Sequence, residues 1–504
     1  MDNSFYLEPF DVHNQRLAGN VHPDGWRNPE PRGRYDLVVL GGGTGGLVSV
    51  AIAAALGART ALVERRLLGG DCLNFGCVPS KAVMRAARAW HEASHARERF
   101  GGPEASGDGD FGAVMERMRR LRAEISEHDS AARFRGLGAD VFLGDARFTG
   151  DDTVEVEGAV LRFRRAVIAT GARPATPPIP GLEEAKPLTN ENVFSLTSLP
   201  RRLAVIGAGP VGCELAQAFA RFGSRVTVFD AAERILDNDD PEAAGLVSRS
   251  LQADGVEFIL SAEVRAVELK GGLRRLRWAV KGEEHSLEAE EVLVATGRVP
   301  NVEGMGLEDA GVEYSRETGV KTDDRLQTSN RRVYAVGDVS SRLQFTHAAD
   351  AQARLAVPNA LFFGRGKASD LVIPWCTYTS PELAHAGIRP WRDGEKGSDA
   401  LTVPLSEIDR ARLDGEEEGF LRVYLKKGSD QVLGATLVAE HAGEVIPQLV
   451  TAMTAGVGLE SLGKTVFPYP TQAEAVRKAA DVLKRRKLTP LAKKALGLAL
   501  KLPR

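Results

Sequence analysis

The sequence has little net charge, no long apolar run and few cysteines. A net charge of −3 gives no reason to expect a nucleic acid as partner. No apolar run reaches the roughly 18 residues that a membrane-spanning helix needs. The opening stretch MDNSFYLEPFDVHNQ is acidic and interrupted by polar residues, which is not the pattern of a secretory signal. We therefore expect a cytoplasmic protein, a compartment in which structural disulfides are rare.

The length and the average composition point to a multidomain globular protein. A chain of 504 residues is too long for one hydrophobic core, so two to four domains are expected. A hydrophobic content of 43% with 26% charged residues is ordinary for such a protein.

Two of the 4 cysteines lie close together, in the stretch GGDCLNFGCVPSK (Gly69–Lys81). Structural zinc needs four ligands, usually from CxxC-like pairs or short-spaced histidines. Cys72 and Cys77 have the spacing CxxxxC, and Cys213 and Cys376 are distant in the sequence. We therefore expect no metal site and interpret the pair as redox-active, which requires a source of electrons.

A glycine-rich turn precedes this stretch. The strand-like run YDLVVL (Tyr35–Leu40) leads into GGGTGG and then into a helical segment. Gly41, Gly43 and Gly46 fit the GxGxxG pattern, which gives a tight turn and lets the backbone approach a pyrophosphate at a helix N-terminus. The next strand, TALVE, ends in Glu64, at the distance expected of an acid that binds a ribose hydroxyl.

The same pattern occurs a second time. The stretch RLAVIGAGPVGCELAQAFARFGSRVTVFD holds Gly207, Gly209 and Gly212 after a strand, and its last strand ends in Asp230. Two such folds in one chain imply two dinucleotides, one a fixed flavin and the other an exchangeable nicotinamide. Because the cysteine pair follows the first unit, we expect the flavin there and a disulfide that accepts electrons from it.

Five motifs in this order resemble the class I pyridine nucleotide-disulfide oxidoreductases. They are the cysteine stretch, ATGARP (Ala169–Pro174), ATGRVPN (Ala295–Asn301), VYAVGD (Val333–Asp338) and TSPELAHAG (Thr379–Gly387). The resemblance covers about residues 35 to 480. It implies an α/β fold with two Rossmann-like domains, one for FAD and one for NAD(P)H, and a C-terminal α+β dimerisation domain. It also implies a homodimer in which the C-terminal domain completes the partner's active site.

The resemblance assigns roles to residues around the disulfide. Cys72 corresponds to the interchange thiol that meets the substrate, and Cys77 to the thiol against the flavin. Lys81 would lie near the flavin N5 region and pair with Glu214, where a cation stabilises the reduced, anionic flavin. A solvated surface pair is the alternative for these two residues.

Further residues would bind the rest of the flavin. Asp338 would bond the ribityl chain of FAD, and the backbone near Thr346 and His347 would cap the pyrimidine end. A structural role is an equal alternative for His347.

The motifs predict an order of domains along the chain. We expect an N-terminal extension draped over the surface at 1–34, an FAD-binding domain at 35–185 and 301–372, an NAD(P)-binding domain at 186–300, a dimerisation domain at 373–480 and a basic C-terminal tail at 481–504.

One departure from the family pattern affects catalysis. Disulfide reductases of this class carry a His-Pro-Thr segment with a Glu five residues after the His. In this chain Pro470, Thr471 and Glu474 match, but Tyr469 takes the place of the His. A phenol with a pKa of about 10 is a poor base at neutral pH. Mercuric reductases have a Tyr at this place.

The predicted function is an NAD(P)H-dependent FAD oxidoreductase that acts on a soft metal ion, a small electrophile or a disulfide, and that is similar to mercuric reductases. Those enzymes also carry a C-terminal cysteine pair, whereas here no cysteine follows Cys376. Dihydrolipoamide dehydrogenase is one alternative. A redox-sensing flavoprotein without turnover is another. No motif in the sequence indicates the acceptor.

Asp230 also bears on the choice of nicotinamide. A carboxylate at this strand end bonds the 2′-hydroxyl of NADH and repels the 2′-phosphate of NADPH. Arg234 lies nearby in the sequence and partly compensates, so we expect NADH with NADPH as a possible second donor.

The C-terminal tail is strongly basic. Residues 482–504 hold eight Lys or Arg and no acid, and Thr489 followed by Pro490 has the pattern of a helix start. On a helical wheel Lys493, Lys494 and Lys501 share one side, opposite apolar residues. Such a helix binds either an anionic membrane surface or the protein's own dimer, and docking on the dimer is the more common outcome.

Overall fold

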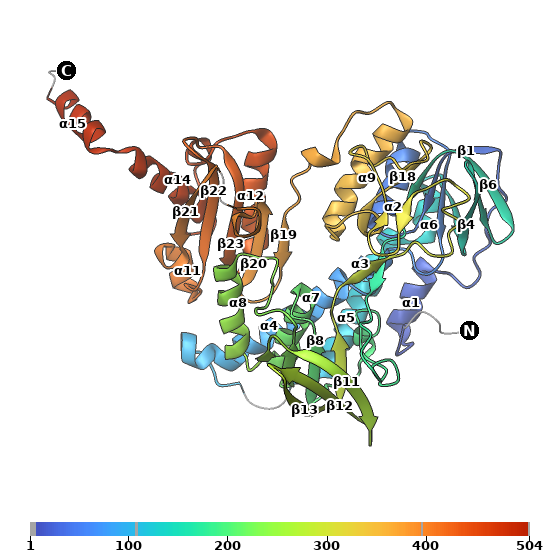
Figure 1. The fold of residues 1–504 in the computed structure, drawn as a ribbon, viewed down its shortest axis with the longest axis horizontal. Coiled ribbons are helices and arrows are strands. Elements are labelled where there is room, and N and C mark those ends of the chain that lie inside the picture. The colour runs from blue at the N-terminus through green and yellow to red at the C-terminus, as the bar shows by residue number, and fades with distance from the viewer. Residues whose placement is uncertain (1–6, 106–108, 395–396, 502–504) are drawn as a thin grey trace. The chain divides into compact units, whose positions relative to one another are not determined.

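The computed structural model describes residues 7–105, 109–394 and 397–501 (Figure 1), and the chain divides into two compact units. The first unit consists of Met1–Ala231 and Val256–Leu371, and the second of Ala232–Gly255 and Val372–Arg504. The first unit holds both predicted dinucleotide folds except residues 232–255 of the second fold, so the predicted boundaries between the two folds at residues 185 and 300 stay a prediction.

The first unit contains a mostly parallel sheet with strand order β3-β2-β1-β6-β5-β4. β18 pairs with the C-terminal end of β6. Most of its parallel strands are apolar and fully buried, as expected for a sheet covered on both faces. β4 and β5 instead form an antiparallel extension. The strands are β1 (Arg34–Leu40), β2 (Thr60–Glu64), β3 (Asp140–Leu143), β4 (Ala146–Gly150), β5 (Thr153–Val156), β6 (Ala159–Ile168) and β18 (Val333–Ala335).

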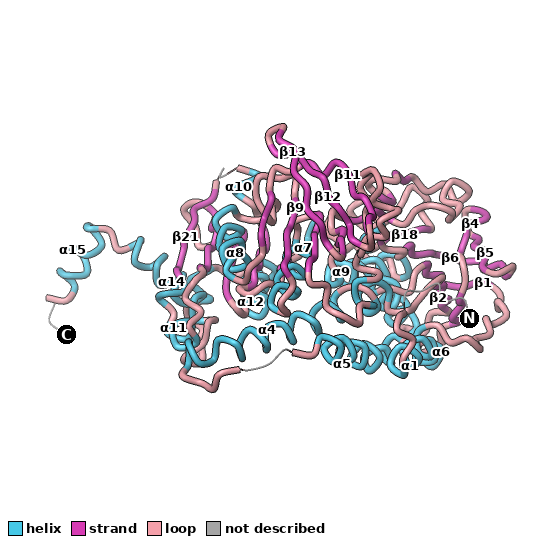
Figure 2. Tube along the Cα trace, turned by 90° about the horizontal axis from the view of Figure 1, so that it is seen from below, coloured by secondary structure: helices cyan, strands magenta, loops and turns pink. Residues whose placement is uncertain are grey.

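Helices pack around this sheet. α2 connects β1 to β2 and packs against α9. The long α4 runs beside α5 and α7 (Figure 2). These elements are α2 (Thr44–Ala55), α3 (Gly70–Asn74), α4 (Cys77–Phe100), α5 (Phe111–Ile125), α6 (Ala131–Gly136), α7 (Pro210–Arg221) and α9 (Thr346–Leu361).

The prediction that residues 1–34 drape over the surface is wrong for the described part of that segment. It forms helix α1 (Val12–Val21), capped by the Asp11 side chain, which accepts from the His13 and Asn14 amides. Leu17 and Val21 are fully buried in the core around α2 and α6. The sequence pattern missed this helix because its buried face is narrow and includes a polar residue, Asn14.

The second dinucleotide fold has a parallel sheet in the order β10-β9-β8-β14 and a separate antiparallel sheet in the order β11-β12-β13. An antiparallel ribbon of β7 and β15 joins it to the first fold. The strands are β7 (Ala172–Pro174), β8 (Arg202–Ile206), β9 (Arg225–Phe229), β10 (Glu257–Ile259), β11 (Glu263–Lys270), β12 (Leu273–Val280), β13 (Glu283–Ala289), β14 (Glu291–Val294) and β15 (Arg298–Pro300). A short pair, β16 (Tyr314–Ser315) and β17 (Gly319–Val320), lies in the return segment.

The second unit is an α+β domain. Its antiparallel sheet has the order β19-β20-β23-β22-β21, and α8, α12 and α14 pack against it. The elements are α8 (Pro241–Ala253), β19 (Trp375–Thr377), β20 (Glu382–Gly387), α10 (Pro390–Asp393), β21 (Ser398–Pro404), α11 (Asp409–Asp414), β22 (Phe420–Lys426), β23 (Val432–Ala439), α12 (Ala442–Ala455), α13 (Leu459–Leu462), α14 (Glu474–Lys487) and α15 (Pro490–Ala499). The predicted fold class, two Rossmann-like folds with a C-terminal α+β domain, is confirmed.

Within the described residues, no helix combines the length and the apolar character that crossing a membrane requires.

Candidate active site

Two glycine-rich turns follow β1 and β8, and they have nearly the same geometry. Gly41 and Gly207 have φ of +104° and +111°, in the region that favours glycine. A Cβ at Gly41 would lie 2.3 Å from the Ala169 carbonyl oxygen, and one at Gly207 would lie 2.4 Å from that of Ala295. The first glycine of each turn is therefore required by the fold itself.

The second glycine of each turn is not required by packing. A Cβ at Gly209 would meet nothing within 4 Å, and one at Gly43 would meet only the Gly70 Cα at 3.7 Å. Both glycines directly precede a helix, α2 or α7, and cap it without a side-chain hydrogen bond. This leaves an unobstructed backbone at a helix N-terminus, which fits a pyrophosphate group. Both turns thus fit the binding of a dinucleotide.

The strand-end acids bind their own turns. Glu64 Oε2 accepts from the Gly42 amide at 2.6 Å, and Asp230 Oδ2 accepts from the Ala208 amide at 2.6 Å. Burial raises the pKa of Glu64, and the amides of Gly42 and Arg66 oppose that shift. Each acid is held at the mouth of its turn, where a ribose hydroxyl would meet it.

The cysteine stretch packs directly on the first turn. The Gly69 amide donates to the Gly42 carbonyl at 2.8 Å. Gly70 has φ of +56°, and a Cβ there would lie 2.6 Å from the Gly43 Cα. The two glycines before the cysteines are therefore needed because the backbones touch, and the contact brings the thiols next to the first dinucleotide turn rather than the second.

The two thiols differ in their acidity. Cys77 is the first residue of α4, and a hydrogen bond from Cys72 is the main cause that lowers the pKa of Cys77 to about 6. A bond with Thr346 Oγ1 at 3.3 Å and the nearby Lys81 cation also lower this pKa, against burial. The same hydrogen bond, together with burial, raises the pKa of Cys72. In the dithiol state Cys77 is the thiolate and Cys72 carries the proton.

Lys81 and Glu214 form an ion pair between α4 and α7, with Nζ 2.7 Å from Oε2. The Glu214 side chain is only 6% exposed, whereas that of Lys81 is 37% exposed. The pair is therefore not a solvated surface pair, because its acid is buried in α7. Through this pair α7 of the second dinucleotide fold contributes the Glu214 carboxylate to the surroundings of Cys77, where it opposes the effect of the Lys81 cation on the Cys77 pKa.

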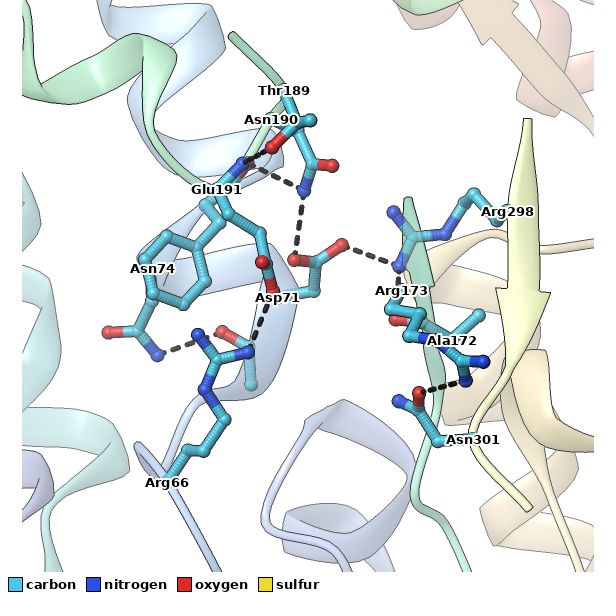
Figure 3. Close-up of polar contacts among 12 residues, drawn as sticks. Arg66, Asp71, Asn74, Ala172, Arg173, Thr189, Asn190, Glu191, Arg298 and Asn301 are labelled. Atoms are coloured by element: carbon cyan, nitrogen blue, oxygen red, sulfur yellow. Dashed lines mark hydrogen bonds and ion pairs between the residues drawn. The ribbon is translucent and has the colours of Figure 1, made fainter. Parts of the chain in front are cut away.

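A polar network links the cysteine stretch to the two segments in which the chain passes from one dinucleotide fold to the other (Figure 3). Asp71 lies directly before Cys72. One of its carboxylate oxygens accepts from Asn190 Nδ2 at 3.1 Å, and the other lies 2.6 Å from Arg298 Nη2. Neither Asp71 nor Arg298 was predicted from the sequence as a site residue, although each stands inside one of the motifs.

Arg298 also reaches the residue expected to bind the ribityl chain. Its Nε lies 3.3 Å from Asp338 Oδ2, and burial raises the pKa of Asp338. His347 lies in the first turn of α9, beside Thr346, and its exposed ring stacks on Phe345 at a centroid distance of 5.4 Å. The fold therefore brings Asp338, Thr346 and the cysteine stretch into one region of the first unit.

Tyr469 and Glu474 belong to the second unit. The Tyr469 side chain is 70% exposed, and its hydroxyl donates to Asp409 Oδ2 at 3.1 Å, which raises the Tyr469 pKa. Glu474 starts α14, is buried and pairs with Arg477 at 2.9 Å. A phenol with a raised pKa is ionised even less at neutral pH than an ordinary tyrosine, so even less phenolate is present to act as a base.

Arg234, the residue expected to compensate for Asp230, is already engaged. Its Nη2 donates to the Asp237 carbonyl at 2.6 Å and lies 3.2 Å from that residue's carboxylate. Binding a 2′-phosphate would require the guanidinium to give up these partners.

Comparisons with known proteins agree with this site. Residues 35–353 match the family model described as pyridine nucleotide-disulphide oxidoreductase, and residues 373–480 match the dimerisation domain of that family. The chain is 36% identical over 452 residues to a mercuric reductase from Staphylococcus aureus, across 89% of this chain and 82% of that protein. It is 32% identical over 455 residues to a dihydrolipoyl dehydrogenase from Bacillus subtilis (strain 168), across 89% and 96% of the two chains.

Among solved structures, the HOCl-induced flavoprotein disulfide reductase RclA from Escherichia coli matches with a TM-score of 0.77 and 26% identity, over 88% of this chain and 99% of that one. The Cu(II) complex of the same protein matches with a TM-score of 0.78. Fold and site together define a two-dinucleotide oxidoreductase with a C-terminal dimerisation domain. The chain belongs to the pyridine nucleotide-disulphide oxidoreductase family, uses FAD and NAD(P)H, and is similar to mercuric reductases.

Proposed function

We propose that this enzyme uses NAD(P)H to reduce a soft metal ion or a small electrophile through the Cys72–Cys77 pair. The observation that carries the proposal is Tyr469, an exposed phenol with a raised pKa where disulfide reductases of this class have an imidazole base. Oxidising a dithiol substrate needs a base to form the attacking thiolate. A soft electrophile needs no such base, because thiolates bind it directly.

The chain's own residues supply the thiol chemistry. FAD, when bound at the first turn, supplies the two-electron carrier between the nicotinamide and the disulfide. Cys77 is held as a thiolate by Cys72 and Thr346, and Cys72 keeps its proton until an acceptor binds, when that proton passes to solvent. Each catalytic cycle then moves two electrons, because the pair passes between the dithiol and the disulfide. Lys81 and Glu214 set the local charge beside Cys77.

The names of two relatives support a soft metal acceptor. One is a mercuric reductase, and the structure of another was solved as a Cu(II) complex. We infer that this chain forms a homodimer through its dimerisation domain and that Tyr469 of one subunit faces the thiols of the other. Tyr469 then holds the acceptor or closes the pocket against water.

Dihydrolipoamide dehydrogenase is the second candidate, favoured by relatives of that name at 32% identity. Because Tyr469 replaces the base, we expect dihydrolipoamide oxidation to be slower by about 10²–10⁴-fold than in an enzyme with the His. We also propose NADH as the preferred donor, since Asp230 is held at its turn and Arg234 is engaged by Asp237.

An anaerobic assay of NADH loss tests the proposal, with Hg(II), Cu(II), lipoamide and oxidised glutathione as acceptors and dihydrolipoamide oxidation as the reverse assay. Tyr469→His should raise dithiol–disulfide exchange and leave or lower metal reduction. Tyr469→Phe is the matched control, since it removes only the hydroxyl. Efficient dihydrolipoamide turnover by the natural chain, undiminished in Tyr469→Phe, would rule out the metal proposal in favour of the second candidate.

A further inference from the structure

The tail after the dimerisation domain contains a helix with an unusual distribution of charge. α15 begins with Thr489, whose hydroxyl accepts from the Ala492 amide at 3.2 Å, and Pro490 occupies its first turn. The helix lies outside the residues that match the family model. In Figure 1 it extends beyond α14 and apart from the sheet of its unit. None of its described residues is buried.

The apolar residues of α15 are exposed. Leu491 is 78% exposed and Leu498 is 61% exposed. At about 100° per residue, Lys493 and Lys494 of α15 fall within one third of the circumference, and Leu491, Leu496 and Leu498 fall outside that arc. A helix whose leucines are exposed to water is only marginally stable, because most helical stability comes from packing of an apolar face. The face therefore needs a partner.

The charge of the surrounding chain indicates which partner. The last turn of α14 is basic, with Lys484, Arg485, Arg486 and Lys487. Together with the two lysines of α15, and with Lys501 and Arg504 after it, this gives eight basic residues and no acid over 482–504. Each basic residue near an anionic membrane contributes about 1 kcal/mol of attraction, and an apolar helix face adds to it.

We propose that α15 binds the protein to an anionic lipid surface, with its leucines in the headgroup boundary and its lysines toward the phosphates. The test is cosedimentation of the full-length holoenzyme with phosphatidylserine–phosphatidylcholine vesicles and with phosphatidylcholine vesicles alone. We expect binding to the anionic vesicles only, weakened by salt because screening reduces the attraction.

Two double variants distinguish binding by α15 from a general effect of the protein's positive charge. Lys493→Glu/Lys494→Glu should weaken vesicle binding by at least about tenfold. Lys426→Glu/Lys427→Glu, two adjacent exposed lysines at the end of β22, should not change it. Absence of vesicle binding, or an equal loss in both variants, would refute the proposal. If Leu498→Ser weakens the dimer in sedimentation equilibrium while vesicles remain unbound, the helix covers a second copy of the chain instead.

A separate observation concerns Asp71. The two chain crossings between the dinucleotide folds meet at this carboxylate, through Asn190 on one side and Arg298 of β15 on the other (Figure 3). Arg298 Nη2 also donates to the Ala172 carbonyl on β7 at 2.8 Å. The guanidinium is thus shared between Asp71, before the interchange cysteine, and Asp338, at 3.3 Å.

We infer that Asp71 is a positioning residue that shares the Arg298 guanidinium with Asp338 and so weakens the hold of Arg298 on Asp338, which leaves Asp338 able to bind FAD. The inference rests on the proposed role of Asp338 toward the ribityl chain. Without the Asp71 charge, Arg298 would have Asp338 as its remaining carboxylate within 4.0 Å among the described residues, and would compete with the flavin for it. Burial strengthens this competition because charge interactions are less screened there.

The measurement is FAD release, followed by the rise of flavin fluorescence on dilution of the holoenzyme. Asp71→Asn should weaken FAD retention by about tenfold, the loss expected when a charge-assisted contact is misdirected. Asp71→Glu should restore most of it. In an Arg298→Met background Asp71→Asn should have no further effect, since it acts through Arg298. The matched control is Asp151→Asn, which removes a surface partner of Arg332.

Two outcomes would contradict this inference. Unchanged FAD release in Asp71→Asn would refute it directly, and so would an equal loss with and without Arg298. If Asp338→Asn itself leaves FAD release unchanged, the proposed ribityl contact is wrong, and the role of Asp71 falls with it. Asp71→Ser provides a second variant should Asp71→Asn fail to fold.

Discussion

The acidity of Cys77 can be tested by a titration in which the two cysteines are separated. In the Cys72→Ser holoenzyme no disulfide forms, and a Cys77 thiolate beside oxidised flavin should give a long-wavelength charge-transfer band without any reductant. In the natural dithiol the pKa of Cys77 is lowered to about 6, and we expect Cys77 of the variant to keep enough of this lowering to be mostly thiolate at pH 7, whereas an ordinary thiol of pKa about 8.5 would be roughly 3% ionised. The band should therefore disappear as the pH falls through about 6.

The contacts of Cys77 predict how variants in this background shift the midpoint. Thr346→Val removes the bond at 3.3 Å and should raise the midpoint by about one unit, since a hydrogen bond to a charged group is worth roughly 1.5–3 kcal/mol. Lys81→Met should raise it less, because the cation is partly neutralised by Glu214 at 2.7 Å. Glu214→Gln should lower it, since that carboxylate raises the Cys77 pKa.

The assay is absorbance of the band against pH, with Cys77→Ser as the control in which no band should appear. The hydroxyl introduced at position 72 still donates to the thiolate, so the main interaction that lowers the pKa is kept. A midpoint near 8.5 in Cys72→Ser, or a rise of the midpoint in Glu214→Gln, would show that the reasoning about these contacts is wrong. Persistence of the band in Cys77→Ser would reverse the assignment of the two thiols.

Three further outcomes are expected. Asp230→Ser should raise the ratio of kcat/KM for NADPH over NADH by about tenfold or more, because it removes a carboxylate that repels the 2′-phosphate; an unchanged ratio would refute the proposed role. Gly46→Ala should prevent folding, since its Cβ would lie 1.8 Å from the Gly41 carbonyl oxygen, whereas Gly43→Ala should fold and lose FAD; circular dichroism and flavin content separate the two. Burial lowers the pKa of His385 to about 4, so the unfolded chain binds a proton that the folded chain does not between about pH 6.5 and 4. Stability in urea should therefore fall over that range as the pH drops, and His385→Asn should flatten the slope.

Features that depend on residues close together in the chain could be predicted from the sequence alone. A strand, a turn with glycine at positive φ, a helix and a terminal acid follow one another within about 30 residues, so the pattern of Gly41 to Glu64 predicts its own geometry. The same holds for Gly207 to Asp230. The cysteine stretch follows the pattern of Gly41 to Glu64 within a few residues, so its position beside the first glycine-rich turn was also predictable.

Contacts between residues far apart in the chain could be found only in the folded structure. Asp71, Asn190, Arg298 and Asp338 meet although more than a hundred positions separate the first from the others. The acidity of Cys77 likewise depends on Thr346, which is 269 positions away. Helix α1 was not predicted because its stability comes from burying Leu17 and Val21 in a core built by other segments. The physical reason is the same in each case: local pattern fixes backbone conformation, whereas charge, burial and hydrogen bonding between side chains are set by which distant segments the fold brings into contact.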